Sequence, residues 1–534
     1  MWNKFKNLFR KESTENGPKI FYKNYNKNKK LLQKHFEKVG DLKIRELEIT
    51  SKNGEKARCM MFYIQSLVEE DLIDDDLIKP LILEQRIANY DRLGKGKKLF
   101  ENLPDKIISV NSIKKASEVE DAIEAILNGF TVLFVEGVAD FYMISTQGWK
   151  DRPIAPPEVE RSVRGPKVAF IENLKINLGS IRRVIKSDKL KIEYFTIGEY
   201  TRTRVAVVYL EGIANTQIVK EVKKRLDSIN VAQLNGCTHV MELIEDNPLS
   251  LFETIYETER VDVVTAGILE GRVSVVTDGC PTALLVPKLF MENFTSPEDY
   301  YNRHWYTLGI RILRFFGFLI STMLPAVYIS ILSFHQELLP LTLVRTVYAS
   351  REGVPFPIVL EMLLFLFFFE AIKEAGARIP SSLGSAVSIV GALILGQAAI
   401  QAGFLSADGV IIGSITGISI FLIPIIEFNQ SLLILRTIFI LASAFIGFYG
   451  IALAIILVTG HLCSMRSFGV PITSPMAPLQ LEDLKDYFVR VPYLLMHKRP
   501  ESLETENKVR QGNRPVRRFF FKYNLDHDYK KENE

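Results

Sequence analysis

The sequence has few residues suited to metal or redox chemistry. Its 534 residues include four cysteines and seven histidines, and both kinds are scattered along the chain. Cys59, Cys237, Cys280 and Cys463 contain no CxxC pair and no metal-ligand spacing, so neither a disulfide framework nor a zinc site is indicated. The histidines form no HExxH pattern. We therefore expect no metal site, no cofactor and no enzymatic activity.

Signals for phosphate or calcium binding are also lacking. The run Gly94–Lys98 (GKGKK) has neither the spacing nor the Ser/Thr of a phosphate-binding loop, and a charged surface turn explains it better. The acidic run Glu69–Asp76 lacks the spacing of a calcium loop and fits a solvated face. Neither run is a candidate site.

An export signal is missing from the N-terminal region. Residues 1–38 contain eleven Lys or Arg, three acidic residues and no apolar core that would engage a translocon. The soluble region that follows should therefore remain in the cytoplasm. We expect residues 1–45 to form a flexible basic tail, with contact to anionic lipid headgroups as the alternative interpretation.

Charge is sparse in one part of a chain that is 47% hydrophobic overall. Between Pro380 and Gly460 the only charged residues are Asp408, Glu427 and Arg436, whereas the first 300 residues are charged throughout. This uneven distribution predicts a large soluble part followed by a helical membrane domain at residues 301–480.

Uncharged runs indicate where the chain crosses a bilayer, which takes about 20 apolar residues in a helix. Four runs qualify: Phe315–Phe334, Pro380–Ala407, Gly409–Ile426 and Thr437–Gly460. Residues 355–380 form a doubtful fifth, because their uncharged core of eight residues (MLLFLFFF) would extend ~12 Å as a helix. We predict four spans plus one re-entrant or interfacial helix, with five spans as the alternative.

The two ends of the chain favour an even number of crossings. The residues after 479 form a charged tail, 481–534, with an unbroken series of basic side chains: Arg510, Arg514, Arg517, Arg518 and Lys522. The positive-inside rule places this tail in the cytoplasm. Since the N-terminal region is expected there too, four crossings fit and five do not.

Strand-like runs alternate with helical patterns in the soluble part. The strand-like runs are Thr131–Val135, Lys191–Thr196, Val205–Leu210 and Val273–Val276. Asn215–Ile229 predicts an amphipathic helix, because Ile218, Val222, Leu226 and Ile229 share one face behind an Asn N-cap. The alternation predicts an α/β region. The proline-rich stretch at 151–166 divides it into a first lobe, 46–155, and a second lobe, 156–300.

Small side chains recur at helical spacing after Pro380. They are Ser381, Ser385, Ser388, Ala392, Gly396, Ala399 and Gly403, which we call the small-residue stripe. Steps of three or four residues place them on one face of a helix. The stripe fits close packing between helices or a pore-lining face in a symmetric ring of copies, and spacing alone favours packing.

Two glutamates flank the apolar core of residues 355–380. Glu361 and Glu370 are nine residues apart, so they lie on opposite faces of a helix. Glu370 has Lys373 and Glu374 beside it and fits an ordinary polar helix end. Glu361 has apolar neighbours, which makes it a candidate functional carboxylate inside the membrane. An interfacial residue that reaches lipid headgroups is the alternative.

Several long motifs together carry a family pattern. They include PPEVERSVRGPKVAFIENLKINLGSIRR at 156–183, ILEGRVSVVTDGCP at 268–281, SPEDYYNR at 296–303, LPAVYISILSFHQELLP at 324–340 and HLCSMRSFGVP at 461–471. In these motifs the sequence resembles the A subunit of the GerA-type nutrient germinant receptors of spore-forming Firmicutes, over most of residues 60–480. The motif residues of the soluble region that we single out are Arg164, Gly165, Pro166, Glu172, Asn173 and Asn177.

The resemblance implies a protein of the spore inner membrane that acts with a permease-like B subunit and a lipoprotein C subunit. A subunits of that family are thought to form a homo-oligomeric ring that conducts monovalent cations when nutrient binds. On this ground pore lining by the small-residue stripe becomes as good an interpretation as packing. A secondary transporter, or a non-conducting scaffold for the permease-like partner, remains the alternative. The expected partners are thus the other subunits and the lipid bilayer, with no nucleic acid.

Overall fold

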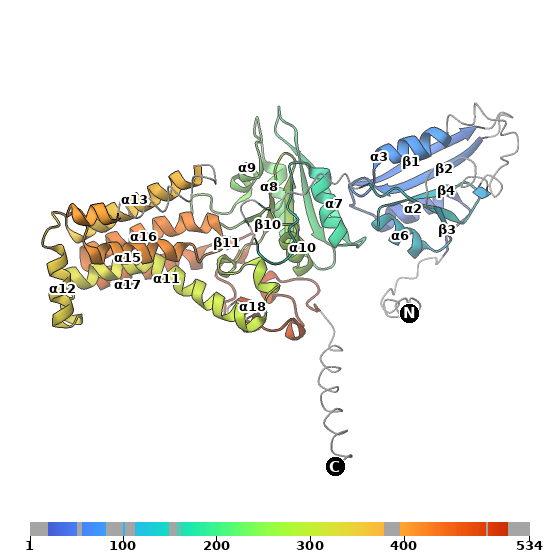
Figure 1. The fold of residues 1–534 in the computed structure, drawn as a ribbon. Helices are drawn as coiled ribbons and strands as arrows, with labels where there is room; N and C mark the ends of the chain where they lie inside the picture. Colours follow the sequence, from blue (N-terminus) through green and yellow to red (C-terminus); the bar gives the residue numbers. More distant parts are fainter. Residues whose placement is uncertain are drawn as a thin grey trace, which may run out of the picture.

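The computed structural model describes residues 20–50, 56–81, 100–101, 113–148, 157, 160, 162–378, 396–487 and 490–510. Figure 1 shows an elongated molecule with two sheet-containing lobes toward one end and a bundle of long helices at the other. The first lobe lies farthest from the helices, and the second lobe lies between them. The second lobe is therefore the part of the soluble region that contacts the helical bundle.

The first lobe is built on a five-stranded sheet in the order β1-β2-β4-β5-β3. Its strands are β1 (Leu42–Thr50), β2 (Lys56–Ile64), β3 (Ile113–Ala116), β4 (Phe130–Val135) and β5 (Phe141–Ser145). Neighbouring strands pair antiparallel. The helices α2 (Tyr25–His35) and α6 (Val119–Leu127) share one hydrophobic cluster with this sheet. The other cluster includes residues of η1 (Ile73–Ile78), a π-helix that follows α3 (Glu70–Leu72).

The prediction that residues 1–45 form a flexible tail is wrong for the part that the structure describes. The helix α2 begins after Asn24, whose side chain accepts hydrogen bonds from the amides of Asn26 and Lys27. Tyr25, Leu32 and the following Phe36 are buried in the first lobe. Their spacing of seven and four residues places three large apolar side chains on one helical face, and burying that face holds the basic helix on the sheet.

The second lobe has the same strand pattern, in the order β6-β7-β9-β10-β8. Its strands are β6 (Leu190–Ile197), β7 (Thr203–Leu210), β8 (Tyr256–Thr258), β9 (Val273–Thr277) and β10 (Ala283–Val286). The four strand-like runs expected from sequence therefore fall within β4, β6, β7 and β9. All pairings in this sheet are antiparallel too. Both lobes thus mix helices with antiparallel sheets.

Helices cover both faces of the second sheet. The helices α7 (Leu174–Val184) and α10 (Val261–Glu270) share one hydrophobic cluster with it. The helices α8 (Thr216–Ser228) and α9 (Cys237–Ile244) belong to the cluster that includes residues of the helical bundle. Asn215 caps α8 as predicted, because its side chain accepts a hydrogen bond from the amide of Gln217.

A disulfide joins Cys237, at the start of α9, to Cys280, and their Cα atoms are 6.0 Å apart. No sequence pattern predicts this pair, because the two residues are 43 positions apart and belong to no spacing motif. Only the fold brings the end of the β9–β10 turn against α9. Cys59 and Cys463 are free cysteines.

A buried ion pair connects the two lobes. Arg182 of α7 donates from Nε and Nη2 to the two carboxylate oxygens of Asp41, at 2.8 and 2.6 Å. Both side chains are almost fully buried, at 1% and 2% exposure. A two-bond guanidinium–carboxylate contact fixes orientation as well as distance, so it constrains how the first lobe sits on the second.

The structure gives the bounds of six helices in the bundle, and residues 396–401 are helical too. The six are α11 (His304–Phe334), α12 (Leu341–Arg351), α13 (Ile358–Arg378), α15 (Ala407–Ile420), α16 (Ile426–Ile446) and α17 (Phe448–Ser464). Within the described ranges, α11 and α16 are long and apolar enough to cross a membrane, and α15 and α17 are shorter apolar helices. The short helix α12 lies across the end of the bundle that is far from the lobes (Figure 1).

The run Thr437–Gly460 was expected to be one span, and the structure divides it between two helices. Gly447 separates α16 from α17 with a backbone φ of 60°. This left-handed conformation favours glycine, because a side chain would be strained there. An uncharged run does not reveal the reversal, since both arms are equally apolar.

Both ends of the bundle lie at the second lobe. At the C-terminal end of α17, His461 Nε2 is 3.0 Å from Ser250 Oγ. The hairpin that follows, β11 (Arg466–Ser467) and β12 (Val470–Pro471), is held by Ser467 Oγ, which donates to the Thr254 carbonyl at 2.5 Å. The chain therefore enters and leaves the bundle on one side, as an even number of helical passes requires.

Candidate functional site

Glu361 lies at the end of the bundle that is far from the lobes, and it is buried at 1% exposure. Its Oε1 accepts hydrogen bonds from the amide and the hydroxyl of Ser406, at 2.6 and 2.5 Å. Ser406 is the N-cap of α15, and its Oγ also accepts from the Gly409 amide at 3.1 Å. A carboxylate at a helix N-terminus is stabilised by the helix dipole and the free amides there. Glu361 thus ties α13 to the first turn of α15.

Arg351 supplies the positive charge beside Glu361. Its Nη1 pairs with Glu361 Oε2, and its Nη2 donates to the Phe356 carbonyl at 3.4 Å. Arg351 ends α12, so the pair also fixes the loop between α12 and α13. The expectation that Glu361 has only apolar neighbours is wrong. Arg351 and Ser406, ten and forty-five residues away in sequence, both contact its carboxylate.

A second carboxylate joins the same cluster. Asp408 Oδ2 accepts from the Tyr328 hydroxyl at 2.5 Å, and its Oδ1 accepts from the Ser350 hydroxyl. Tyr328 lies on α11 and Ser350 on α12, so Asp408 links these helices to the start of α15. We call Tyr328, Ser350, Arg351, Glu361, Ser406 and Asp408 the distal polar cluster.

The glycines of α15 allow α13 to approach closely. A Cβ atom at Gly409 would lie 2.6 Å from Glu361 Oε1. Cβ atoms at Gly413 and Gly417 would lie 2.2 and 2.5 Å from the rings of Phe365 and Phe369. Three glycines four residues apart thus form a groove on α15 that accepts one face of α13.

Glu370 is on the other face of α13, as its spacing from Glu361 predicts. Its Oε1 forms an ion pair with Lys373, the neighbour expected from sequence. Its Oε2 is buried and has no hydrogen-bond partner in the described part of the chain. Glu370 therefore differs from Glu361, whose two oxygens both have partners.

The small-residue stripe lies only partly within the described residues. Ser381, Ser385, Ser388 and Ala392 fall outside them. A Cβ at Gly396 would meet no atom of the described residues within 4 Å, so none of them requires a glycine there. Gly403 follows the last helical residue and has a φ of 69°, so it ends the helix and does not belong to a helical face. Including Gly403 in the stripe was wrong.

The motif residues of the second lobe hold a loop against the start of α11. Arg164 Nη1 donates to Asn302 Oδ1 at 3.3 Å. Gly165 has a φ of 108°, and a Cβ there would lie 2.7 Å from the Tyr301 ring. The Pro166 carbonyl accepts from Arg260 Nη2 at 3.1 Å. These contacts hold the loop that contains Arg164, Gly165 and Pro166 against the start of α11, and we call residues 162–166 the docking loop.

The other three motif residues shape the entry to α7. Asn173 is its N-cap and accepts from the Ile176 amide at 3.3 Å. Asn177 is buried and bonds both the amide and the carbonyl of Ile171, at 2.9 and 2.5 Å. The Glu172 carbonyl accepts from the Gly279 amide at 2.7 Å. They position the backbone, and no cofactor is needed to explain them.

Arg260 connects the docking loop to α10. It is 1% exposed, forms an ion pair with Asp262 at 2.8 Å, and donates to the Ser162 hydroxyl. Thr258 lies beside it, donates to Glu160 Oε2 at 2.5 Å, and accepts from the Arg260 amide. Burial raises the pKa of Glu160 to about 7.

Asp299 joins the second lobe to the base of α11. Its carboxylate is 3.0 Å from Arg311 Nε and 2.8 Å from Arg314 Nη1, and all three side chains are buried. It also accepts from the Ser296 amide in a capping box around the 3-10 turn η4 (Pro297–Tyr300). Asp299 is not among the residues predicted from sequence, although the Ser-Pro-Glu-Asp order at 296–299 is a recognisable capping-box signal.

The C-terminal segment adds to this junction. Arg311 Nη1 donates to the carbonyls of Asp486 and Tyr487, the second at 3.2 Å, in the short helix α18 (Leu484–Tyr487). Residues 481–534 are the predicted charged tail, and the described part of it, up to residue 510, packs against the second lobe. Buried contacts of Tyr487 and Leu503 give the physical reason.

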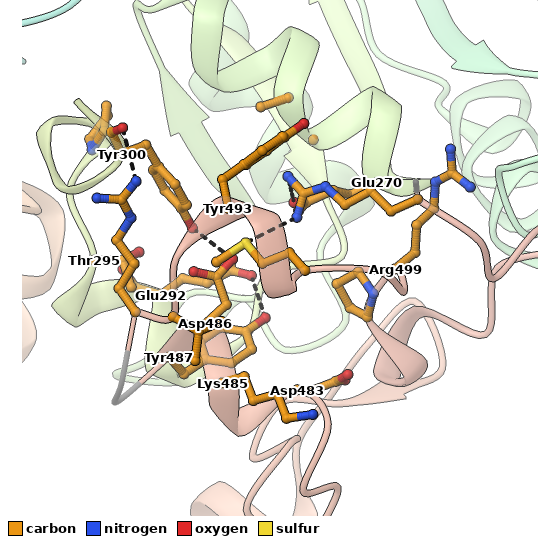
Figure 2. Close-up of a pocket in the computed structure, with 18 of the residues that line it drawn as sticks. Glu270, Glu292, Thr295, Tyr300, Asp483, Lys485, Asp486, Tyr487, Tyr493 and Arg499 are labelled. Atoms are coloured by element: carbon orange, nitrogen blue, oxygen red, sulfur yellow. Dashed lines mark hydrogen bonds and ion pairs between the residues drawn. The ribbon is translucent and has the colours of Figure 1, made fainter. Parts of the chain in front are cut away.

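A cavity of about 430 Å³ lies between α10, the segment before α11 and this C-terminal segment (Figure 2). In it the Tyr300 hydroxyl donates to Asp486 Oδ2 at 3.1 Å, and Arg510 Nη2 is 3.3 Å from Glu270 Oε1. Arg499 donates only to backbone carbonyls, including that of Leu269 at the end of α10. The polar groups of the cavity thus hold the C-terminal segment onto the lobe.

Burial controls the charges in the cavity. It raises the pKa of Glu270 and of Asp486, and the nearby Arg510 and Arg311 partly offset the shift. Arg272 crosses the cavity wall to Glu292, with Nη1 2.8 Å from Oε2. Burial lowers the pKa of Arg272, but the charge and hydrogen bonds of Glu292 outweigh this effect, and the pKa is raised overall. Within the described ranges, no group of three or more His, Cys, Asp or Glu is placed to hold a metal ion.

Comparison with known proteins identifies the family. A family profile described as "Bacillus/Clostridium GerA spore germination protein" matches residues 30–502. "Spore germination protein KA" of Bacillus subtilis (strain 168) is 41% identical over 472 residues, which covers 88% of this chain and 85% of that protein. "Spore germination protein GerLA" of Bacillus cereus is 34% identical over 469 residues, covering 88% of this chain and 93% of that protein.

A solved structure also resembles part of this chain. It is the crystal structure of the N-terminal domain of the A subunit of the Bacillus megaterium spore germinant receptor GerK3, with 28% sequence identity and a TM-score of 0.39. The match covers 51% of this chain and 97% of that one. The family profile and the relatives confirm the resemblance that the sequence motifs indicated: this chain belongs to the Bacillus/Clostridium GerA family of spore germination proteins.

Proposed function

We propose that this protein is the A subunit of a nutrient-sensing germinant receptor, and that several copies form a ring that conducts monovalent cations when nutrient binds. It would act with a permease-like B subunit and a lipoprotein C subunit. The family supports the receptor role. That the copies form a ring, that the ring conducts cations and that the two partners take part are what the sequence resemblance implies.

One observation carries the proposal at the level of structure. Asp299 belongs to the soluble lobe and holds two arginines of α11, the longest helix of the bundle. A buried contact of this kind moves as a unit, because separating the charges leaves them unpaired in a medium of low dielectric constant. A change in the second lobe would therefore reach α11 directly, as a gated membrane protein requires.

We place this protein in the spore inner membrane, as the family resemblance implies, with the lobes in the cytoplasm. The 21 residues of α13 extend ~31 Å at 1.5 Å per residue, about the thickness of the hydrocarbon core. Glu361 near its start pairs with Arg351 at the end of α12, and α12 lies at the far end of the bundle (Figure 1), so α13 runs back toward the lobes. We therefore propose a full pass for α13 in place of the re-entrant helix. Because the run Thr437–Gly460 also divides into α16 and α17, the four predicted spans become six, an even number that keeps both chain ends in the cytoplasm.

Ion flux in liposomes tests conduction. Liposomes that contain this subunit with both partners should release K⁺ when nutrient is added, whereas liposomes with the partners alone should not. Release that is equal with and without this subunit would contradict the channel and leave a scaffold role for the chain. The matched control is the complete complex carrying Lys485→Gln, because Lys485 is exposed and its ion pair with Glu482 is on the surface.

A further inference from the structure

Arg436 is a buried cation in the middle of α16. It lies at the centre of Ile426–Ile446 and is 3% exposed, among the buried side chains of Leu432, Leu435 and Phe439. Its Nη1 is buried and has no hydrogen-bond partner in the described part of the chain. A buried cation in an apolar bundle is costly, and an unsatisfied donor such as Nη1 adds to the cost, so a residue of this kind is a candidate for a functional role.

The facing helix holds a complementary unpartnered atom. The charge of Glu370 on α13 acts on Arg436, and α13 packs against α16. Glu370 Oε1 is paired with Lys373, three residues along the same helix, while Oε2 is buried without a hydrogen bond. Among the described residues, Arg436 Nη1 is thus a donor without an acceptor and Glu370 Oε2 is an acceptor without a donor, and the two residues have opposite charges and lie on neighbouring helices.

We propose that Glu370 exchanges between Lys373 and Arg436, and that this exchange defines two positions of α13 against α16. The inference rests on the proposed receptor function, which it extends by naming a two-state contact inside the bundle. The pair with Lys373 moves with α13, because both residues lie on it. The pair with Arg436 would join two helices, so it exists only in one of the two positions.

Each of the two states has one ion pair and one cation that Glu370 does not pair. In the present structure Glu370 keeps one ion pair, and the buried Nη1 of Arg436 has no hydrogen-bond partner among the described residues. In the other state Glu370 and Arg436 satisfy each other, and Lys373, whose side chain is half-buried, is released toward solvent. Exchanging one charge pair for another changes the free energy by much less than breaking a pair, and small differences of this kind are what a ligand can shift.

Substitutions of the two basic residues separate this proposal from a purely structural role. Lys373→Gln weakens the present state, and Arg436→Gln weakens the other. The nutrient concentration that gives half-maximal germination should therefore move in opposite directions, by about fivefold or more in each case. In a Glu370→Gln background both shifts should vanish. Shifts in the same direction, or shifts that persist with Glu370→Gln, would overturn the exchange.

Matched variants guard against misfolding. Arg436→Lys and Lys373→Arg keep the charge, and each should resemble the parent more closely than the glutamine variant does. Arg345→Gln removes an exposed arginine of α12 and should leave the nutrient response unchanged. Immunoblots of spore membranes show whether each receptor accumulates. If Arg436→Lys and Arg436→Gln give the same shift, the charge of Arg436 is not what matters and the proposal fails.

Cross-linking measures the contact without relying on conduction. Glu370→Cys and Arg436→Cys are combined with Cys463→Ser, which removes the exposed free cysteine. The fraction of receptor oxidised to the α13–α16 disulfide should change when nutrient is added to membranes that contain the complete complex. An unchanged fraction would overturn the exchange. A changed fraction in a complex that carries no K⁺ current would keep the exchange and reject the channel.

Discussion

Glu361 of α13 and Ser406 at the start of α15 are joined by two hydrogen bonds to one carboxylate oxygen, from the amide at 2.6 Å and from the hydroxyl at 2.5 Å. The other oxygen pairs with Arg351. All donors that face this carboxylate are therefore used to hold helices together. Glu361 therefore connects the helices at the far end of the bundle. It is neither an isolated carboxylate in the membrane nor a residue that reaches lipid headgroups.

Glu361→Gln should destabilise the receptor. The change leaves the Arg351 guanidinium without its buried counter-charge, and removing one partner of such a pair costs about 3–5 kcal/mol. We expect a lower melting temperature of the purified protein in detergent and less receptor in spore membranes. Glu370→Gln is the matched variant on the same helix, and it should leave the receptor level unchanged. Equal levels of both variants and the parent would contradict the role given to Glu361.

Gly409→Ala should weaken the same contact between Glu361 of α13 and the start of α15. The added Cβ would lie 2.6 Å from Glu361 Oε1 and 2.8 Å from Ser406 Oγ, so the carboxylate would have to leave its hydrogen bonds. Gly396→Ala is the control, because a Cβ there would meet nothing within 4 Å. Thermal unfolding of the two variants should show a loss for Gly409→Ala alone. A similar loss for Gly396→Ala would indicate a general effect of removing glycine from these helices.

Asp299→Asn should uncouple the second lobe from α11. It leaves Arg311 and Arg314 buried without a carboxylate, at a cost of about 3–5 kcal/mol. The exposed pair of Glu482 and Lys485 provides a comparison, since Glu482→Gln should cost about 0–1 kcal/mol. Limited proteolysis at the boundary between lobe and bundle measures the difference. Protection of Asp299→Asn equal to that of the parent would contradict the coupling.

The stability of the soluble region should depend on pH through Glu160. Its pKa is raised by burial from 4.5 to about 7, so the folded protein binds a proton that the unfolded chain releases. The free energy of unfolding should therefore fall as the pH rises from about 4.5 to about 7. Glu160→Gln, which stays neutral, should flatten this dependence in thermal melts. The exposed Asp75→Asn serves as the control, and a slope that persists in Glu160→Gln would contradict the assignment.

Ser388→Trp tests whether the small-residue stripe lines a pore. A bulky ring on a pore-lining face should abolish nutrient-triggered germination while the protein level stays normal. The same ring on a packed face should remove the protein itself, because close helix contacts exclude large side chains. Germination of spores and immunoblots of their membranes together decide between the two interpretations.

The sequence by itself determined the parts of this protein that depend on local pattern. The strands β4, β6, β7 and β9 and the capped helix α8 follow from alternation, helical spacing and an Asn N-cap, all of which act over a few residues. The long motifs identified the family, and the ion pair between Glu370 and Lys373 follows from a spacing of three residues on one helix.

Only the tertiary structure decided the features that join distant segments. Arg351 and Ser406 reach Glu361 from opposite sides in sequence, and Asp299 meets Arg311 and Arg314 across a change from turn to helix. The reversal at Gly447 lies in a uniformly apolar run, and hydropathy does not show where such a run changes direction. Charge pairing and close packing depend on which surfaces meet in space, and these pairings emerge only when the helices and lobes are assembled.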